Sequence, residues 1–421
     1  MSREFQVKGI TFGKGMPVIC IPVVERTEDA ILAQIRKLTE QNTAMIEWRV
    51  DHFDRIGSAD AVRDLLEQIR PLVTKTVFLF SIRTVKQGGL ASIDEPKIIR
   101  LNEIAAASGV CDFIDLELFE ASKPLKQIRK LQKKGVKIIA SHHDFKKTPP
   151  EQILRMLMDQ MEQSGADIAK LAMYPQTVDD VIRMMKFTND TREHFPELPI
   201  VTMSMGPLGS LTRICGELTG SCITFGMADQ PSAPGQIPVK ELRETMSVLH
   251  RTMMKSVFLI GFMGTGKSST ARKLSQLAEL PVYEMDEEIE KKEGRSIPEI
   301  FSDSGEPYFR DLETQMCRDF ASMLPCIVST GGGTPMRREN ADYMKAAGTV
   351  ILLTAEPQTV LSRMASSHER PLLKGHMDDP DFVAELMAKR REAYQYAADH
   401  VIKTDGKTPA EVAQEIAALL F

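Results

Sequence analysis

Residues 257–269 read VFLIGFMGTGKSS, and this stretch decides the fold of the second half of the chain. Its apolar start, residues 257–260, predicts a buried strand, and the loop that follows matches the pattern G-x-x-x-x-G-K-[ST]. Backbone N–H groups in such a loop, with a helix N-terminus behind them, bind phosphate oxygens. We therefore expect Lys267 to reach the outer phosphates of a nucleotide and the Ser268 hydroxyl to bind the accompanying Mg²⁺.

Length and composition indicate an ordinary globular protein with two domains. The chain has 421 residues, which is more than one hydrophobic core usually serves. It carries 53 basic and 58 acidic residues, and the net charge of −5 argues against nucleic acid or an acidic membrane as a partner. No apolar run approaches the about 18 residues of a membrane-spanning helix, and residues 1–10 lack the apolar centre of a secretory signal. Because the six cysteines also show no paired spacing, we expect a cytoplasmic protein.

Eight short apolar or β-branched runs alternate with helix-like segments before the phosphate-binding loop. This count and spacing predict a (β/α)8 TIM barrel. A doubly wound open sheet is the alternative, but no G-x-G-x-x-G pattern follows the first run. The predicted strands are residues 17–23, 44–50, 76–82, 112–118, 136–141, 167–172, 199–203 and 221–225.

Charged residues stand at the carboxyl ends of these runs, where a barrel places its chemistry. Glu47 and Arg49 are two residues apart and therefore share one strand face, either as an internal salt bridge or as a binding pair. Arg83 ends the third run and is followed by two glycines, where the backbone could approach a ligand. The fifth run ends in SHHDF, and its two histidines, His142 and His143, are candidates for proton transfer.

Lys170 is the most informative residue of this region, because it lies in the middle of the apolar run DIAKLAM. Burial disfavours the ammonium form, and a neutral amine can attack a carbonyl carbon. The alternative is a lysine whose charge is paired or reaches solvent. Lysine, histidine and several arginines at one barrel mouth favour imine chemistry on a small anionic keto compound.

Residues 1–252 contain six segments that together resemble a type I 3-dehydroquinate dehydratase. In chain order they are EWRVD, SIRT with GG, SHHDF, ADIAK, TMSM and SAPGQ. The resemblance implies that Lys170 forms a Schiff base with the substrate ketone and that His143 removes the proton from the adjacent carbon. It implies no cofactor for this domain. It also implies that 3-dehydroquinate is bound by Glu47, Arg49, Arg83, Arg213 and the lid residues Ser232 and Gln236.

Gln87 departs from that family, which usually has Glu at this position. A neutral amide cannot raise the basicity of a nearby histidine as a carboxylate would. We therefore expect the pKa of His143 to be lower than in family members, with activity retained.

The second region, residues 253–421, repeats strand and helix patterns in the order of a P-loop α/β domain on a parallel sheet. The predicted strands are residues 257–260, 282–284, 326–330, 350–353 and 400–403. Polar groups follow them: Glu284 and Asp286 could support Mg²⁺ or accept a substrate hydroxyl, and the glycines of STGGG would permit close approach.

The motifs GFMGTGKSS, DEEIE, FRDLE, GGG, RPLL and R-x-x-Y resemble shikimate kinase over residues 254–421. The resemblance implies transfer of the γ-phosphoryl group of ATP, carried with Mg²⁺, to a ring hydroxyl of shikimate. Many family members have Asp at the position of Glu284, which makes direct metal support there an open question. The implied shikimate-binding residues are Asp286, Arg310, Gly332 and Arg391. The implied ATP-binding residues are Gly264, Thr265, Gly266, Lys267, Ser268, Ser269, Arg363 on the adenine side and Arg370 on the phosphates, with Ser268 as the metal ligand.

Together these patterns predict a bifunctional shikimate-pathway enzyme with small-molecule substrates. The implied dehydratase product, 3-dehydroshikimate, must be reduced by a separate NADPH-dependent shikimate dehydrogenase before the kinase can act. A homodimer through the barrel is also expected by resemblance. Two alternatives remain: an active kinase fused to an inactive scaffold barrel, which Gln87 motivates, or a Schiff-base aldolase barrel with another small-molecule kinase. SHHDF with SAPGQ argues against the aldolase, and GGG with FRDLE argues against the other kinase.

Overall fold

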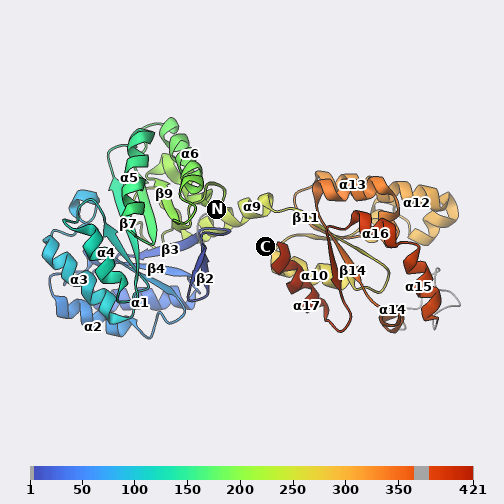
Figure 1. Ribbon diagram of the computed structural model, residues 1–421, viewed down its shortest axis with the longest axis horizontal. Helices are drawn as coiled ribbons and strands as arrows, with labels where there is room; N and C mark the ends of the chain where they lie inside the picture. Colours follow the sequence, from blue (N-terminus) through green and yellow to red (C-terminus); the bar gives the residue numbers. More distant parts are fainter. Residues whose placement is uncertain (1–3, 365–378, 421) are drawn as a thin grey trace. The chain divides into compact units, whose positions relative to one another are not determined.

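The computed structural model describes residues 4–364 and 379–420 of the chain, which divides into two compact units, Met1–Leu249 and His250–Phe421 (Figure 1). Helix α9 (Val239–Met253) contains the point at which the two units divide. The domain boundary expected from the sequence, between residues 252 and 253, stays a prediction. Among the described helices, none has both the length and the apolar character needed to cross a membrane.

The first unit is built on eight strands that all pair in parallel, in the order β10-β3-β4-β5-β6-β7-β8-β9. A parallel bridge between Ile200 and Ser221 joins the two ends of this sheet, so the barrel is nearly closed. All eight predicted strands are present, which confirms the TIM-barrel prediction. The strands are β3 (Val18–Val23), β4 (Met45–Arg49), β5 (Val77–Ser81), β6 (Phe113–Glu117), β7 (Lys137–Asp144), β8 (Ile168–Met173), β9 (Ile200–Ser204) and β10 (Ile223–Phe225).

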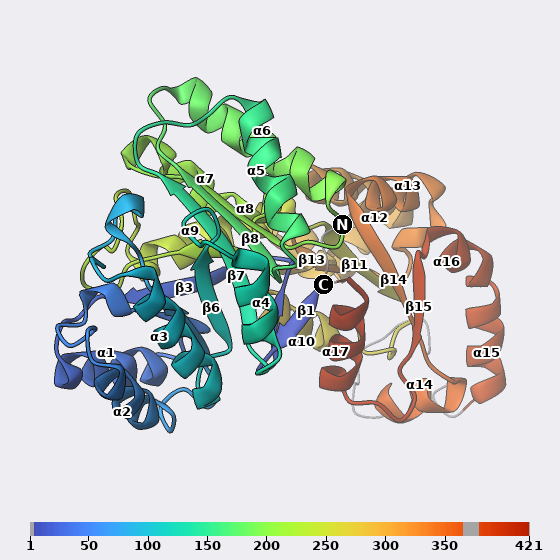
Figure 2. The same ribbon diagram turned by 60° about the vertical axis from the view of Figure 1, so that its left-hand side comes forward.

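Helices cover the outside of the barrel (Figures 1 and 2). The strands are buried on both faces, which explains why they read as continuous apolar runs rather than as alternating patterns. Side-chain caps begin several of the helices; Thr27, Ser58 and Asp94 each accept a backbone N–H of the first turn that follows. The helices are α1 (Glu28–Glu40), α2 (Ala59–Ile69), α3 (Glu95–Ser108), α4 (Pro124–Gln132), α5 (Glu151–Gln163), α6 (Val178–His194), α7 (Ser210–Ile214) and α8 (Gly216–Thr219).

A short antiparallel hairpin, β1 (Phe5–Val7) and β2 (Ile10–Phe12), precedes the barrel and was not predicted. Phe12 stacks on Phe5 and packs against Phe113, with ring centroids 5.2 and 5.5 Å apart. Lys8 in the turn donates to the carbonyl oxygens of residues 73 and 76, which precede β5. The hairpin therefore closes the amino-terminal end of the barrel and leaves the opposite end available for a site.

The second unit is a five-stranded parallel sheet in the order β12-β13-β11-β14-β15, which confirms the predicted P-loop architecture. One face packs on α10 and α17, and the other face packs on the remaining helices of the unit. Its strands are β11 (Ser256–Gly261), β12 (Val282–Glu284), β13 (Ile327–Ser329), β14 (Gly348–Thr354) and β15 (His400–Lys403). Its helices are α10 (Lys267–Ala278), α11 (Met285–Glu293), α12 (Ile297–Ser322, kinked at Gly305), α13 (Arg338–Ala347), α14 (Pro357–Met364), α15 (Pro380–Ala388), α16 (Arg391–Ala397) and α17 (Pro409–Leu420).

Two candidate active sites

One cavity at the carboxyl ends of the barrel strands brings together the eight residues to which the family resemblance assigns a role in the first unit. They come from three strands (β4, β7 and β8), from the segment after β5, from helix α7 and from the loop before α9, which are far apart in the chain. The residues that line the cavity include Glu47, Arg49, Arg83, His143, Lys170, Arg213, Ser232 and Gln236.

Lys170 is buried in this cavity and is also paired. Its Nζ lies 3.2 Å from a carboxylate oxygen of Asp115 and 4.2 Å from the ring centroid of Phe225. The same carboxylate pairs with Arg83 at 2.9 Å. The alternative of a charge-paired lysine is therefore the observed arrangement, and it fixes the position of the Lys170 amine.

Asp115 and Glu117 are buried acids that pair with the cavity cations and that the sequence analysis missed. Burial alone would raise the pKa of Asp115, but the positive charges of Arg83 and Lys170 hold it well below its usual range. Glu117 accepts from Arg83 at 3.0 Å and from the Thr84 hydroxyl at 2.6 Å. Both acids lie within the otherwise apolar run FIDLE. A charged residue within an apolar run is the same signal that identifies Glu47 and Arg49.

Arg49 does not pair with Glu47, although a salt bridge between them was one expectation. It makes a two-pronged ion pair with Asp51, at 2.7 and 2.8 Å. Asp51 also accepts the backbone N–H of Arg83 and of Leu90. This buried carboxylate therefore holds Arg49 and the loop after β5 in one arrangement.

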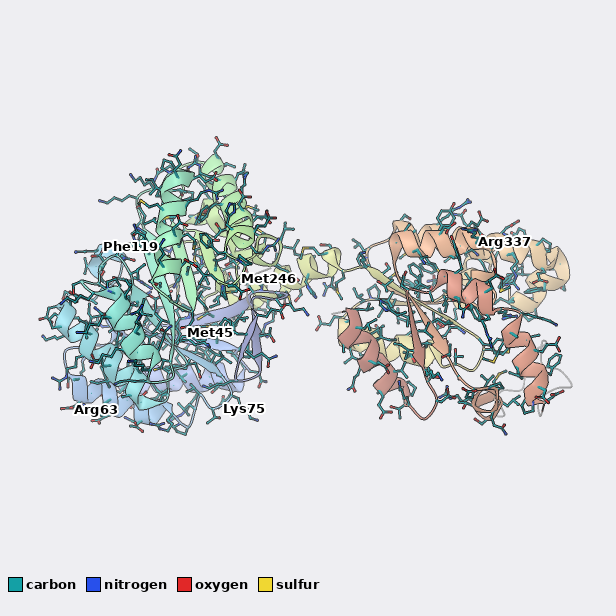
Figure 3. All side chains as sticks on the ribbon, viewed as in Figure 1. Met45, Arg63, Lys75, Phe119, Met246 and Arg337 are labelled. Carbon is teal, nitrogen blue, oxygen red and sulfur yellow. The ribbon has the colours of Figure 1, made fainter. Side chains whose placement is uncertain are left out.

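The two histidines of SHHDF lie on opposite faces of β7, because side chains alternate along a strand. His143 lies in the cavity, where its backbone N–H donates to Oε1 of Gln87 at 2.9 Å and its Nδ1 lies 3.1 Å from the same oxygen. His142 instead packs edge-on against Phe119, which Figure 3 labels, with ring centroids 5.2 Å apart. His142 thus lies outside the group of residues that line the cavity.

Burial lowers the pKa of His143 well below its ordinary value, and the positive charges of Arg83, Lys170 and Arg49 lower it further. The imidazole is therefore neutral at neutral pH. A neutral imidazole next to a lysine amine can accept a proton, which is the requirement for a general base.

The two glycines after Arg83 have a packing role. Gly88 has a φ of 78°, and a Cβ there would lie 2.3 Å from the Phe145 ring. A Cβ on Gly89 would lie 2.1 Å from the carbonyl oxygen of Arg83. The pair thus lets this loop pack tightly beside the cavity, which Gly88 lines, and the approach of this backbone to a ligand stays a prediction.

Arg213 differs from the other cations of the cavity. Within the described part of the chain, it donates hydrogen bonds only to neutral groups. It is 1% exposed and donates to the carbonyl oxygens of Phe225 and Pro234 at 3.3 and 3.2 Å. Burial lowers its pKa to about 10. Close by, Oε1 of Gln236 accepts the backbone N–H of Ser232 at 2.6 Å, which stabilises the loop over the cavity. A buried guanidinium without an acidic partner is suited to an anionic ligand group.

The second site is the loop between β11 and α10. Gly261 must be glycine, because a Cβ would lie 2.3 Å from the carbonyl oxygen of Leu353. Lys267 Nζ donates to the carbonyl oxygens of Gly261 and Phe262 within the loop. Arg363 donates to Thr404 and lies at the rim. The cavity at this loop is lined by the described residues for which ATP binding stays a prediction: Gly264, Thr265, Gly266, Lys267, Ser268, Ser269 and Arg363.

Ser268 is placed to serve as a magnesium ligand. Its hydroxyl donates to Glu284 at 2.9 Å and lies 3.4 Å from the hydroxyl of Ser329. These are oxygen donors, which Mg²⁺ prefers, and nucleotide-bound Mg²⁺ needs only one or two protein ligands. Across residues 4–364 and 379–420, no group of three His, Cys, Asp or Glu residues could hold a metal alone. The residues therefore fit a metal brought by a nucleotide.

The glycine run after β13 lies against two predicted substrate residues. A Cβ on Gly331 would lie 2.9 Å from Asp286 and 2.8 Å from Glu313, and a Cβ on Gly333 would lie 2.2 Å from Arg310. Glycine therefore lets charged side chains approach the backbone closely here. Glu313, which was not predicted, is 1% exposed and orients Arg310 through an ion pair of 2.7 Å.

Arg390, rather than Arg391, lies at the glycine run, where its Nη1 and the Tyr394 hydroxyl donate to the carbonyl oxygen of Gly332 at 3.0 and 2.7 Å. Arg391 is exposed at the start of α16, because successive helical residues point about 100° apart. The prediction for Arg391 is thus corrected by one residue. Arg370 lies outside the described residues.

Known protein families match the two units of the chain separately. A family model for type I 3-dehydroquinase matches residues 19–253, and one for shikimate kinase matches residues 263–420. The 3-dehydroquinate dehydratase of Clostridioides difficile is 37% identical over 254 residues, which is 60% of this chain and 100% of that protein.

Solved structures give similar matches. One is a crystal structure of type I 3-dehydroquinate dehydratase from Clostridium difficile with covalently modified comenic acid. It has 37% sequence identity and a TM-score of 0.58, and the match covers 60% of this chain and 100% of that one. Shikimate kinase from Acinetobacter baumannii in complex with shikimate has 30% identity and a TM-score of 0.39 and covers 41% of this chain and 96% of that one. The chain therefore belongs to the type I 3-dehydroquinase family over residues 19–253 and contains a shikimate kinase domain over residues 263–420.

Proposed function

We propose that this bifunctional shikimate-pathway enzyme dehydrates 3-dehydroquinate through an imine on Lys170 and phosphorylates shikimate at the glycine run beside the P-loop. The observation that carries the proposal is the shared cavity of Lys170, His143 and Arg213, which combines an amine, a base and an anion site.

In the barrel, Lys170 Nζ attacks the ketone of 3-dehydroquinate, and loss of water gives an imine. The imine acts as an electron sink, so that His143 can remove a proton from the adjacent carbon. The electron pair then forms the ring double bond and expels the hydroxyl, which leaves as water after taking the proton from His143. Hydrolysis of the imine releases 3-dehydroshikimate and restores the Lys170 amine.

Arg213 is proposed to bind the substrate carboxylate, because its buried charge has no acidic partner among the described residues. Arg49 and Arg83 already pair with Asp51 and with Asp115, so they provide fixed N–H donors for hydroxyl groups. Glu47 is their counterpart as a hydroxyl acceptor, and Ser232 with Gln236 closes the loop over the substrate.

In the second unit, residues 264–269 would hold the phosphates of ATP, with Lys267 and, by family resemblance, Arg370 on the outer phosphates. Ser268, with Glu284 behind it, would hold Mg²⁺, which when bound neutralises phosphate charge. Asp286 would accept a hydrogen bond from the reacting hydroxyl of shikimate. Catalysis then depends on positioning and on charge neutralisation.

The shikimate carboxylate would be bound by Arg310 and Arg390. Arg310 is fixed by two ion pairs, to Glu306 and Glu313. Arg390 takes the role that the sequence analysis gave to Arg391, because it donates to Gly332 at the same site. We further propose that a separate NADPH-dependent shikimate dehydrogenase connects the two reactions and that the protein dimerises through its barrel.

Borohydride trapping tests the barrel assignment. The purified chain is incubated with 3-dehydroquinate and reduced, and its peptides are analysed by mass spectrometry. The expected result is an adduct on the peptide that contains Lys170, absent in Lys170→Met and absent without substrate. A barrel that acts only as a scaffold would give no adduct in the unmodified protein, and this outcome would overturn the assignment.

A further inference from the structure

A second cavity of the barrel unit has no role in the proposed reactions. It lies between the ends of β5 and β6 and the helices α3 and α4, which are neighbours on the outside of the barrel (Figures 1 and 2). Its volume is about 460 Å³. Protein interiors contain few voids larger than a water molecule, whereas small-molecule sites measure several hundred Å³. The size of this cavity is therefore that of a ligand site.

The wall of this cavity on the side of the barrel is apolar. Ile82 and Leu116 line it at the ends of the strands, and Ile93 and Ile98 line it at the beginning of α3. A ligand group that removes these side chains from water gains the hydrophobic contribution only if it is itself apolar. The part of a ligand that occupies this cavity is therefore an apolar group.

Two acids at the edge of the cavity already have partners within the protein. Glu95 accepts the backbone N–H and the hydroxyl of Ser122 at 2.7 and 2.9 Å and the side-chain amide of Gln127 at 3.2 Å. Glu120 pairs with Lys86 at 2.9 Å. Neither carboxylate therefore requires a positively charged ligand.

A smaller cavity of about 220 Å³ adjoins the first one along α4, and Asn102 lines both. Lys123, Lys126 and Lys130 line the smaller cavity. Lys130 pairs with Glu103, whereas Lys123 and Lys126 make no ion pair with the residues that the structure describes. Two ammonium groups that lack an acidic partner favour an anionic ligand group, such as a carboxylate.

Asn102, where the two cavities meet, has an unmatched hydrogen-bond acceptor. The residue is 3% exposed, and its Oδ1 has no hydrogen-bond partner among the described residues. A buried acceptor without a donor is unfavourable, and such groups need an explanation in a native structure. Because Asn102 lines both cavities, a donor on the ligand would lie between its apolar and anionic groups.

We infer that the two cavities form a binding site for a small carboxylic acid that carries an apolar group and, between the two, an O–H or N–H donor. The apolar group packs on Ile82 and Leu116. The donor binds Oδ1 of Asn102, and the carboxylate binds Lys123 and Lys126.

This site is joined to the dehydratase cavity by one ion pair. Glu117 lines the larger cavity and pairs at 3.0 Å with Arg83, which lines the dehydratase cavity. Thr84 donates to the same carboxylate at 2.6 Å. A ligand that fills the larger cavity leaves Glu117 less room to move, so it holds Arg83 in place and lowers KM for 3-dehydroquinate. This linkage rests on the proposed dehydratase function.

Binding is tested by isothermal titration calorimetry of the full-length chain with 3-phenyllactate, which has a phenyl group, a hydroxyl and a carboxylate in this order. We expect one molecule bound per chain. Asn102→Leu and the double variant Lys123→Gln/Lys126→Gln should each weaken binding by about tenfold. Lys133→Gln, an exposed lysine after the same helix that lines neither cavity, is the control and should bind as the unmodified protein does.

The hydroxyl is tested with 3-phenylpropionate, which lacks it. This acid should bind the unmodified protein about tenfold more weakly than 3-phenyllactate does, and Asn102→Leu should bind both acids equally. Absence of 3-phenyllactate binding at millimolar concentration would overturn the inference. Equal affinity of the unmodified protein and the lysine double variant would also overturn it, because it would place the ligand elsewhere; both lysines are exposed, so the fold does not depend on them.

The linkage is tested by steady-state dehydration kinetics with saturating 3-phenyllactate. KM for 3-dehydroquinate should fall at least twofold in the unmodified protein and stay unchanged in the lysine double variant. An unchanged or increased KM in the unmodified protein would contradict the linkage. The calorimetry needs no substrate, so it reports on the new site even if borohydride trapping at Lys170 fails, which would contradict the dehydratase proposal instead.

Discussion

The carboxylate of Asp115 lies 3.2 Å from Nζ of Lys170, in the interior of the barrel. The same oxygen pairs with Arg83 at 2.9 Å, so one buried acid separates two buried cations. The ion pair with Asp115 explains how an apolar strand of the barrel can accommodate the buried Lys170.

Asp115→Asn should lower the free energy of unfolding of the first unit by about 3 kcal/mol, because it leaves buried cations without their partner. The lowered pKa of Asp115 means that its contribution is fully present above the unfolded value of about 3.9 and is lost as the pH falls towards the folded value. Denaturant unfolding should therefore show a constant difference between the two proteins from about pH 5 to 8 that shrinks in stronger acid.

The matched control is Asp229→Asn, which removes an exposed pair with Lys37 and should cost less than about 1 kcal/mol. Equal effects of the two substitutions would show that the buried pair has no special role.

Gln87→Glu should move the acidic limb of the kcat/KM profile for dehydration to higher pH. A carboxylate beside His143 raises the pKa of that imidazole, and the base acts only when it is unprotonated. The unmodified protein should thus remain active at lower pH than the variant. An acidic limb at the same pH in both proteins would show that a carboxylate at position 87 does not raise the pKa of His143.

Lys267→Ala should reduce phosphoryl transfer by about a hundredfold or more and leave dehydration unchanged, because the lysine serves only the phosphate loop. Lys273→Ala, an exposed lysine on the same helix, is the control and should leave both activities intact. If Lys267→Ala also abolished dehydration, the two sites would not be independent.

Arg390→Ala should raise KM for shikimate by about tenfold, which corresponds to the loss of one charge-assisted hydrogen bond. Arg391→Ala should change it less than about twofold, because that side chain is exposed. KM for both variants is measured by ADP release, which distinguishes the roles of the two adjacent arginines. A larger increase in KM for Arg391→Ala than for Arg390→Ala would show that Arg391, and not Arg390, binds shikimate.

The sequence predicted both folds and most of the selected residues that line the two cavities, because each rests on a local pattern. Eight apolar runs define the barrel strands, and charged residues inside such runs, such as Glu47 and Lys170, mark the cavity. Asp115 carries the same signal, and applying the criterion to every strand would have found it.

Other features depend on geometry that a sequence does not state. The choice of Arg390 over Arg391 depends on the exact residue at which α16 begins. The hairpin at the start of the chain has strands of only three residues, and its one local signal is a Lys8–Gly9 turn with positive φ at both positions. The contact between Gln87 and His143 joins the short 3-10 helix after β5 to strand β7, so spacing along the chain gives no indication of it.

We expect this one chain to catalyse two steps that are separated by a reduction. The most direct test supplies the purified protein with 3-dehydroquinate, ATP and Mg²⁺ and measures ADP release, with and without added shikimate dehydrogenase and NADPH. We expect ADP only when the dehydrogenase and NADPH are present, because the dehydratase product is not the kinase substrate. Absence of ADP with the complete mixture, or ADP release without the dehydrogenase, would contradict the account.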